Sequence, residues 1–374
     1  MYILLISAII IQLVTLFRTP FYNYFNKLDG SIYVYSTMDM LITCLVLYSI
    51  WNVSNRRVKE QINAWCRVEK VSHTILCITI VLFIYALSLA FSSISFILSG
   101  ATRQALITEH NMFGFGYLLV SSYFKIMFPM YLITNVRKLF KFLLGIGFLL
   151  SMIITASRNE LIYAGYLIAT IYMIRDFRHG FKTVTIVIVA FMLLAFFITI
   201  MQGRPVGDGF ISVISVFDKH LLYRSYSLYL SDRVTSMPLD VDKYLYPFFG
   251  YISDKFLSIL SLVNNSIDNS FVSHYEFLGY DKGTGNYYYA NVLYPWWSWF
   301  ILAFGPIGIL IKSIYIFFVF YVLLRVGFIF TYLYLMSIVL YSSPFYTPLI
   351  TIGGVISIFI TVFIDIKLRR ENDV

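Results

Sequence analysis

The feature that most constrains this chain is a series of long apolar segments. A helix that crosses the hydrocarbon core of a membrane needs roughly 17 to 25 mostly apolar residues, because lipid cannot hydrogen-bond an exposed backbone. Segments of this kind recur along the 374 residues. We expect spans at 2–17, 32–51, 74–98, 112–135, 142–157, 161–174, 183–201, 298–324, 326–343 and 349–366.

Composition points the same way. The chain is 59% hydrophobic and 13% charged, whereas a soluble domain is roughly half apolar and a quarter charged. Met1 opens directly onto an apolar run with no cleavage site, so we expect the first span to be retained. The sequence predicts an all-α polytopic membrane protein with about 10 transmembrane helices, or 11 to 12 if the longest loop hides further spans.

The short loops between these spans differ in their content of Lys and Arg, which concentrate on the cytoplasmic side of membrane proteins. One set of loops, together with the C-terminal tail, carries 15 Lys and Arg residues, whereas the opposite set carries four. We therefore expect both termini in the cytoplasm. The formal net charge of +9 follows mainly from this bias and does not indicate nucleic-acid binding.

One connection is far longer than the others and lies on the non-cytoplasmic side. Apolar residues at near-helical spacing predict short helices within it. The chain thus divides into an N-terminal transmembrane bundle of about seven helices (1–201), a large, partly helical periplasmic loop (202–297), and C-terminal transmembrane helices with a cytoplasmic tail (298–374).

A polar turn, Ser157-Arg158-Asn159-Glu160, separates the two shortest apolar segments on the side of the long loop. An interfacial turn with a local Arg–Glu pair is one explanation. The other is an anion site recessed below the surface, because the flanking helices are too short to reach full height. We favour the second, with Arg158 and Glu160 as substrate-binding residues.

Three further charges lie in or near apolar segments. Asp39 and Lys125 are within spans, where charged side chains usually face a cavity or each other. A structural Asp39–Lys125 pair is therefore the alternative to a functional role. Lys312 can instead extend to a membrane interface.

Arg204 follows the seventh span in Gly203-Arg204-Pro205, where the proline stops the helix. A guanidinium is always charged and binds two oxygens at once, which suits a diphosphate. Anchoring to lipid headgroups is the alternative. Within the long loop, Arg224 is a further candidate for substrate binding.

The end of the long loop carries the densest group of titratable side chains outside the basic loops. His274, Glu276 and Asp281 are followed at once by Lys282 and by a run of aromatic residues that includes Tyr288. The aromatic residues indicate an interfacial belt, a surface that stacks on sugars, or both.

The spacing of His and Cys residues predicts no metal site, and no glycine-rich phosphate-binding loop indicates a nucleotide cofactor. Asp240-Val241-Asp242 matches the loose carboxylate pattern of metal-dependent sugar transfer, but a tripeptide of this kind is common by chance. We therefore expect neither a metal nor a cofactor.

The layout resembles the O-antigen polymerase (Wzy-type) family. The resemblance rests on the multiple spans, the short helix pair carrying SRNE, and a late extracytoplasmic loop that closes with TGNYYYANVLYPWWSWFILAFGPIGIL. It implies an inner-membrane glycosyltransferase that joins oligosaccharide repeat units carried on undecaprenyl diphosphate. Arg158 and Arg204 match arginines at the outer ends of spans, and His274 matches a histidine late in the loop, as the related O-antigen ligases have.

This chemistry suits the candidate residues. Diphosphate is a good leaving group, so Arg204 and Arg158 need only neutralise its charge, and no metal is required. His274 or Glu276 is the expected base for the acceptor hydroxyl. The resemblance also implies a chain-length regulator and a flippase as partners. A flippase, an O-antigen ligase-like transferase and an acyltransferase remain the alternatives for the chain itself.

Overall fold

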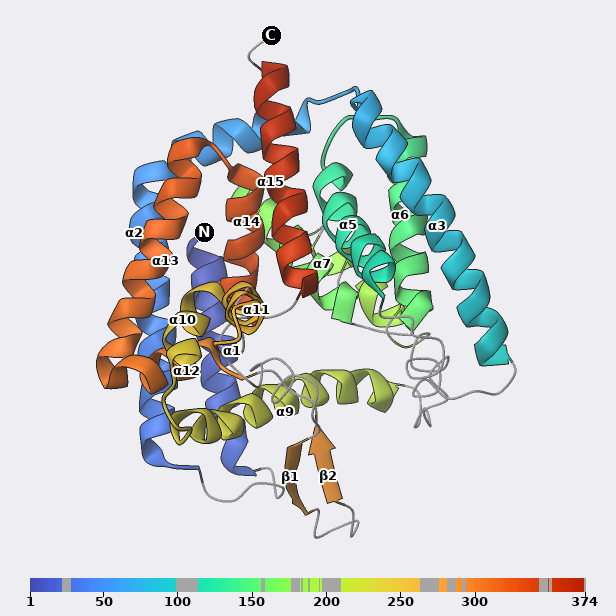
Figure 1. Ribbon diagram of the computed structural model, residues 1–374. Helices are drawn as coiled ribbons and strands as arrows, with labels where there is room; N and C mark the ends of the chain where they lie inside the picture. The colour runs from blue at the N-terminus through green and yellow to red at the C-terminus, as the bar shows by residue number, and fades with distance from the viewer. Residues whose placement is uncertain are drawn as a thin grey trace. The chain divides into compact units, whose positions relative to one another are not determined.

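The structure is a computed structural model that describes residues 1–21, 28–98, 114–155, 159–175, 182, 184–187, 189–194, 196, 210–262, 276–280, 287–290, 294–342, 349 and 352–372. The described residues are almost entirely helical (Figure 1). They form two compact units. Unit 1 comprises Met1–Ser54, Ile214–Val326 and Ile338–Val355, and unit 2 comprises Asn55–Val213, Gly327–Ser337 and Ile356–Val374. These units group segments by their contacts rather than by their order along the chain. The predicted division into 1–201, 202–297 and 298–374 therefore stays a prediction.

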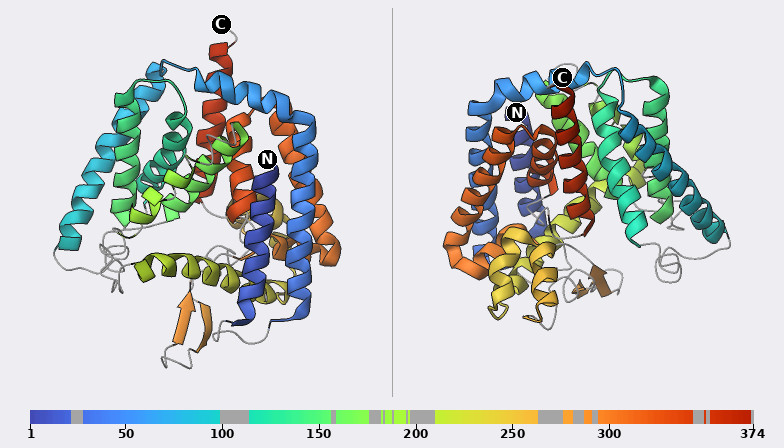
Figure 2. Two further views of the ribbon diagram at one scale, coloured as in Figure 1. Left: turned by 180° about the vertical axis from the view of Figure 1, so that it is seen from behind. Right: turned by 45° about the horizontal axis from the view of Figure 1, so that its top comes forward.

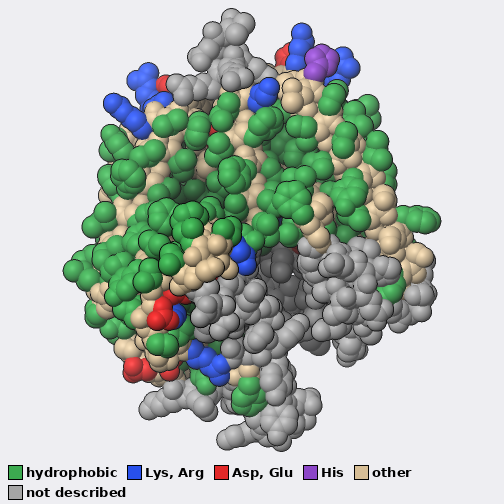
Figure 3. All heavy atoms as spheres, viewed as in Figure 1, with side chains coloured by type: hydrophobic (Ala, Val, Ile, Leu, Met, Phe, Trp, Pro, Cys, Tyr) green, Lys and Arg blue, Asp and Glu red, His purple; other side chains and the backbone are tan. Residues whose placement is uncertain are grey.

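Among the described residues, four stretches of helix are long and apolar enough to cross a membrane: Tyr2–Phe21, Gly30–Cys66, His73–Phe96 and Trp296–Val326. They coincide with four of the expected spans, and the total of about ten stays a prediction. Side chains that face away from each unit are largely hydrophobic on these helices, such as Ile6 and Ile314. Figure 3 shows the same preference on the face that it presents, as contact with lipid requires.

Helix α2 (Gly30–Cys66) corrects the expectation of a loop from residue 52. The helix continues through the basic segment for 37 residues, or roughly 55 Å at 1.5 Å per residue. No Pro or Gly interrupts it after Gly30, and Arg56 pairs with Glu60 one turn later at 2.8 Å. Hydropathy located the apolar part of this helix but could not mark its end, because a polar helix continues without an apolar signal.

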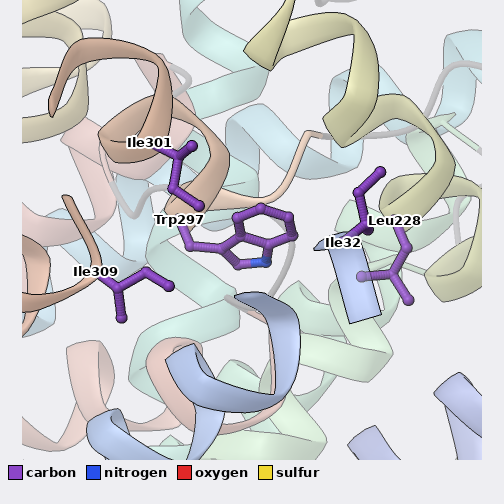
Figure 4. Packing of buried hydrophobic residues seen from close by; sticks show 5 residues of the cluster. All are labelled: Ile32, Leu228, Trp297, Ile301 and Ile309. Atoms are coloured by element: carbon purple, nitrogen blue, oxygen red, sulfur yellow. The ribbon is translucent and has the colours of Figure 1, made fainter. Parts of the chain in front are cut away.

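Unit 1 contains the helices α1 (Tyr2–Arg18), α9 (Phe210–Thr235, from Ile214 onward), α10 (Val241–Phe249), α11 (Tyr251–Ile259), α12 (Trp296–Phe304) and α13 (Gly308–Val326), with the first part of α2. Helix α9 crosses the C-terminal end of α1 (Figure 1). The indole of Trp297 packs among Ile32, Leu228, Ile301 and Ile309, which come from four different helices (Figure 4). Helices α9, α10 and α11 show that the predicted long loop is partly helical.

A tight break separates α12 from α13. Gly305 has a positive φ of 63°, and Pro306 follows it in a short 3-10 turn, η3 (Gly305–Ile307). At Gly308 a Cβ atom would collide with the carbonyl oxygen of Phe300. Glycine at this position therefore lets α13 approach the backbone of α12.

The sequence did not predict the one sheet among the described residues, a two-stranded hairpin. Strand β1 (Glu276–Tyr280) pairs antiparallel with β2 (Tyr287–Ala290), with a bulge between Phe277 and Gly279. Both strands are rich in aromatic residues, which favour strands. Their short length gave too few alternations to distinguish a strand from an irregular loop.

Unit 2 is built around α3 (His73–Leu98), α5 (Phe115–Leu132), α6 (Lys138–Thr155) and α7 (Asn159–Arg175). Helix α6 packs between α3 and α5 (Figure 2). Buried hydroxyls join these helices: Thr79 and Tyr123 lie 2.6 Å apart, and Ser93 donates to the carbonyl oxygen of Ile154 at 3.0 Å.

The remaining helices of unit 2 are α14 (Ile329–Ser337) and most of α15 (Ile352–Asn372). The Asp365 carboxylate accepts the backbone N–H groups of Phe330 and Thr331, each at 2.9 Å, and the Thr331 hydroxyl at 2.8 Å. A side chain of α15 thus satisfies the first N–H groups of α14, which have no partner within their own helix. Helix α14 packs against α7.

Candidate functional site

Five of the predicted site residues lie outside the described residues: Arg158, Arg204, His274, Asp281 and Lys282. Their expected roles stay predictions. The other four, Glu160, Arg224, Glu276 and Tyr288, lie in described elements.

Glu276 begins β1 and Tyr288 lies in β2, so backbone pairing brings these two residues into one hairpin. In the register, Glu276 is opposite Ala290 and Tyr288 is opposite Gly279. The hairpin places a carboxylate-bearing residue and three consecutive tyrosines, Tyr287–Tyr289, within one small element of unit 1.

Arg224 lies on α9 and is buried against α1. Its Nε donates to Thr15 Oγ1 at 3.2 Å, and its Nη2 donates to Gln12 Oε1 at 3.3 Å. Next to it, Thr19 Oγ1 donates to Ser225 Oγ at 2.9 Å. These hydrogen bonds attach α9 to the first helix of the chain, and the predicted role of Arg224 in substrate binding is not tested by them.

Glu160 is buried at the start of α7, with 9% of its surface exposed. Its Oε1 accepts hydrogen bonds from the Tyr117 hydroxyl and from Ser121 Oγ, each at 3.1 Å. Its Oε2 is buried and has no hydrogen-bond partner within the part of the chain that the structure describes. Glu160 lies in the first turn of α7, where the helix dipole favours a negative charge.

Lys125 lies on the same face of α5 as the two hydroxyls that hold Glu160, because Tyr117, Ser121 and Lys125 are spaced four residues apart. Its Nζ lies 5.2 Å from the ring centroid of Tyr163. Tyr163 is three residues after Glu160 on α7 and therefore shares its face. Glu160 is close enough to interact electrostatically with Lys125.

The α5–α7 polar face therefore consists of Tyr117, Ser121, Lys125, Glu160 and Tyr163. The sequence singled out Glu160 and Lys125 separately. It did not link them, and it missed the two hydroxyl donors. The available signal was the repeat of polar residues every four positions in an otherwise apolar helix, which places them on one face.

The alternative of an Asp39–Lys125 pair is wrong, and so is an interfacial position for Lys312. Lys312 Nζ donates to both carboxylate oxygens of Asp39, at 2.6 and 2.7 Å, with Thr43 Oγ1 at 3.4 Å. The two side chains are 1% and 4% exposed. The Trp296 ring lies 5.1 Å from the same ammonium. This pair joins α2 to α13 within unit 1, across 273 positions of sequence.

The Asp240-Val241-Asp242 tripeptide lies at the start of α10. Asp240 forms an ion pair with Lys243 at 2.8 Å, and burial raises the pKa of the Asp242 carboxyl. Among the described residues, no group of three or more His, Cys, Asp or Glu side chains is placed to hold a metal ion.

No protein-family model, curated protein or solved structure matches the chain. The family resemblance described above thus rests on the layout of the sequence, and the function is argued from the residues themselves.

Proposed function

We propose that this chain is a membrane glycosyltransferase that polymerises oligosaccharide repeat units carried on undecaprenyl diphosphate, at the periplasmic face of a bacterial inner membrane. Both termini would lie in the cytoplasm. The product would be an O-antigen, a capsule or a related polysaccharide. The apolar helices support the membrane setting, and the charge bias of the short loops supports the orientation.

The observation that carries this proposal is the environment of Glu160. A carboxylate in an interfacial turn would be solvated, whereas this one is buried between α5 and α7 and is oriented by two hydroxyl donors. One oxygen is thereby occupied, and the other keeps its capacity to accept a hydrogen bond. A fixed carboxylate of this kind suits a sugar hydroxyl, which is the group that both substrates of a polymerase present.

The reaction that we propose is a single displacement. The acceptor hydroxyl attacks the anomeric carbon of the donor sugar, a new glycosidic bond forms, and the bond between that carbon and the diphosphate oxygen breaks. His274 or Glu276 takes the hydroxyl proton. Arg204 and Arg158 neutralise the charge on the departing lipid diphosphate, as fixed cations do efficiently where water is scarce.

The other candidate residues would position the two glycan chains. Tyr288 offers an aromatic face for a sugar ring, and Arg224, Asp281 and Lys282 offer charged groups for hydroxyls or acidic sugars. A chain-length regulator and a flippase are the expected protein partners, because polymer length and substrate delivery need both.

The test is a complementation experiment in a host that lacks this gene, scored by the ladder of polysaccharide lengths on a gel. Polymerisation predicts that the null host makes only single repeat units and that the intact gene restores the ladder. Glu160→Gln and Arg204→Ala, at matched membrane levels, should each lose most of the ladder. Glu60→Gln is the matched control, because Glu60 is an exposed carboxylate paired only at the surface of α2.

Two results would contradict the proposal. Loss of even the single-unit band in the null host would mean that units do not reach the periplasm, which is the expected result for a flippase. A full ladder that stays on its lipid carrier in the null host would instead indicate a ligase.

A further inference from the structure

The α5–α7 polar face contains a lysine whose ammonium is not neutralised by a direct contact. Within the described part of the chain, Lys125 forms no hydrogen bond or ion pair, and its Nζ lies 5.2 Å from the ring centroid of Tyr163. An ammonium has three donors, and a buried or half-buried one normally uses them. Among the described residues, none of the three donors of Lys125 has an acceptor, so we consider them as donors for a ligand.

The residue Lys125 is less enclosed by the protein than Lys312 is. Its side chain is partly exposed, whereas Lys312 is fully buried. One helical turn, or roughly 6 Å, separates its Cα from that of Ser121, which holds Glu160. A single ligand can therefore contact the ammonium and the carboxylate together.

The two charges have complementary requirements. Glu160 Oε2 lacks a donor, and Lys125 lacks an acceptor, yet the two do not satisfy each other by a direct ion pair among the described residues. A phosphate supplies acceptor oxygens to an ammonium, and a sugar hydroxyl supplies a donor to a carboxylate. A glycosyl phosphate carries both groups next to each other.

We propose that Lys125 binds a phosphate group of a lipid-borne diphosphate while Glu160 Oε2 accepts a hydrogen bond from the sugar attached to it. The identification of this ligand as the glycan carrier rests on the proposed function. The anion-binding role of Lys125 rests only on its unsatisfied ammonium and on the arrangement of α5 and α7.

The experiment measures ligand binding to the full chain in nanodiscs of phosphatidylcholine, by the rise in melting temperature with ligand concentration. The main probe is undecaprenyl diphosphate, which carries no sugar. We expect Lys125→Gln to weaken its binding by at least about tenfold, because a charge-assisted hydrogen bond is lost. Lys125→Arg should retain most of the binding, and Lys138→Gln, which changes an exposed lysine, should leave it unchanged.

Glu160→Gln provides a second, opposite signature. Removing the nearby negative charge should leave binding of the sugarless diphosphate unchanged or make it tighter by about twofold or more. A purely structural arrangement predicts instead that both variants lower the melting temperature without ligand and that neither changes affinity.

Three further probes identify the source of the phosphate. Equal binding of undecaprenol would show that the lipid tail alone is recognised, and equal binding of phosphatidylglycerol would indicate a general lipid-headgroup site. Binding of soluble pyrophosphate at the same affinity would show that the lipid is not required. Each of these results overturns the proposal, as does undiminished binding by Lys125→Gln.

The polysaccharide ladder separates this inference from the proposed function. If Lys125→Gln loses diphosphate binding but keeps the full ladder, the site binds lipid and the polymerase function at this site is wrong. If the null host lacks polymer and Lys125→Gln binds normally, the function stands and the inference about Lys125 is wrong.

Discussion

Lys312 and Lys125 each lie within an apolar helix, one in each compact unit, and their surroundings differ sharply. Lys312 in unit 1 has two carboxylate oxygens, a hydroxyl and an aromatic ring around its ammonium. Lys125 in unit 2 has an aromatic ring and a nearby carboxylate that it does not touch. A charge in the membrane is expensive in both positions. Among the described residues, Lys312 is neutralised by a direct contact with a carboxylate and Lys125 is not.

The difference separates a structural role from a functional one. A satisfied and inaccessible pair holds α2 against α13 and has no donor left for a ligand. An ammonium with no hydrogen bond or ion pair among the described residues, such as that of Lys125, leaves binding capacity for a ligand. The sequence treats both lysines alike, because each is a single charge in an apolar run.

The largest expected effect is on stability, and it tests the structural role of the Asp39–Lys312 pair. Asp39→Leu leaves the Lys312 ammonium buried without its carboxylate, which should destabilise the protein by about 3–5 kcal/mol. Thermal unfolding of the purified protein in detergent should show a strongly lowered melting temperature or a failure to accumulate. The double variant Asp39→Leu, Lys312→Met removes both charges and should recover much of the loss. A mild effect of Asp39→Leu alone would mean that the pair contributes little.

A smaller loss of stability is expected where the start of α13 lies against α12, at Gly308. Gly308→Ala places a Cβ against the Phe300 carbonyl and pushes α13 away from α12, at a cost of about 1–3 kcal/mol. Lys312 is one turn further along the same face of α13, so its contact with Asp39 should weaken too. Gly30→Ala is the control, since nothing lies within 4 Å of a Cβ there. Equal melting temperatures for the two variants would contradict this packing.

The variant Asp365→Ala tests a contact that stabilises α14 in unit 2, the unit that contains Lys125. This change removes the acceptor for two backbone N–H groups at the start of α14, which packs against α7. Loss of a helix cap costs about 1–2 kcal/mol. We expect a modest fall in melting temperature and faster hydrogen exchange at Phe330 and Thr331. Unchanged exchange at those two amides would show that Asp365 does not cap the helix.

The smallest expected change in stability is the one that best distinguishes Lys125 from Lys312. Lys125→Gln removes a charge that has no ion-pair partner among the described residues, so this variant should change the melting temperature without ligand by less than Lys312→Gln does. We expect a shift equivalent to about 0.5 kcal/mol or less, as at sites without specific contacts. A large fall for Lys125→Gln would show that Lys125 is structural after all.

The candidate site was only partly predictable from the sequence. Glu160 was recognisable because a carboxylate between two short apolar segments is rare, and the structure shows that it is buried. Its hydroxyl donors Tyr117 and Ser121 were missed, because each is unremarkable in a membrane helix and only their four-residue spacing with Lys125 marks a polar face. The hairpin that contains Glu276 and Tyr288 was also missed, because two short strands carry little periodicity.

What the sequence determined by itself is local. Long apolar runs specify helices in a membrane, because lipid leaves each helix to satisfy its own backbone, and the four longest apolar helices lie where hydropathy places them. What only the tertiary structure decided is which charges meet. Asp39 has Lys312 as its partner rather than Lys125 because the fold of unit 1 brings these two side chains of α2 and α13 within hydrogen-bond distance. No local pattern encodes a contact between residues 273 positions apart.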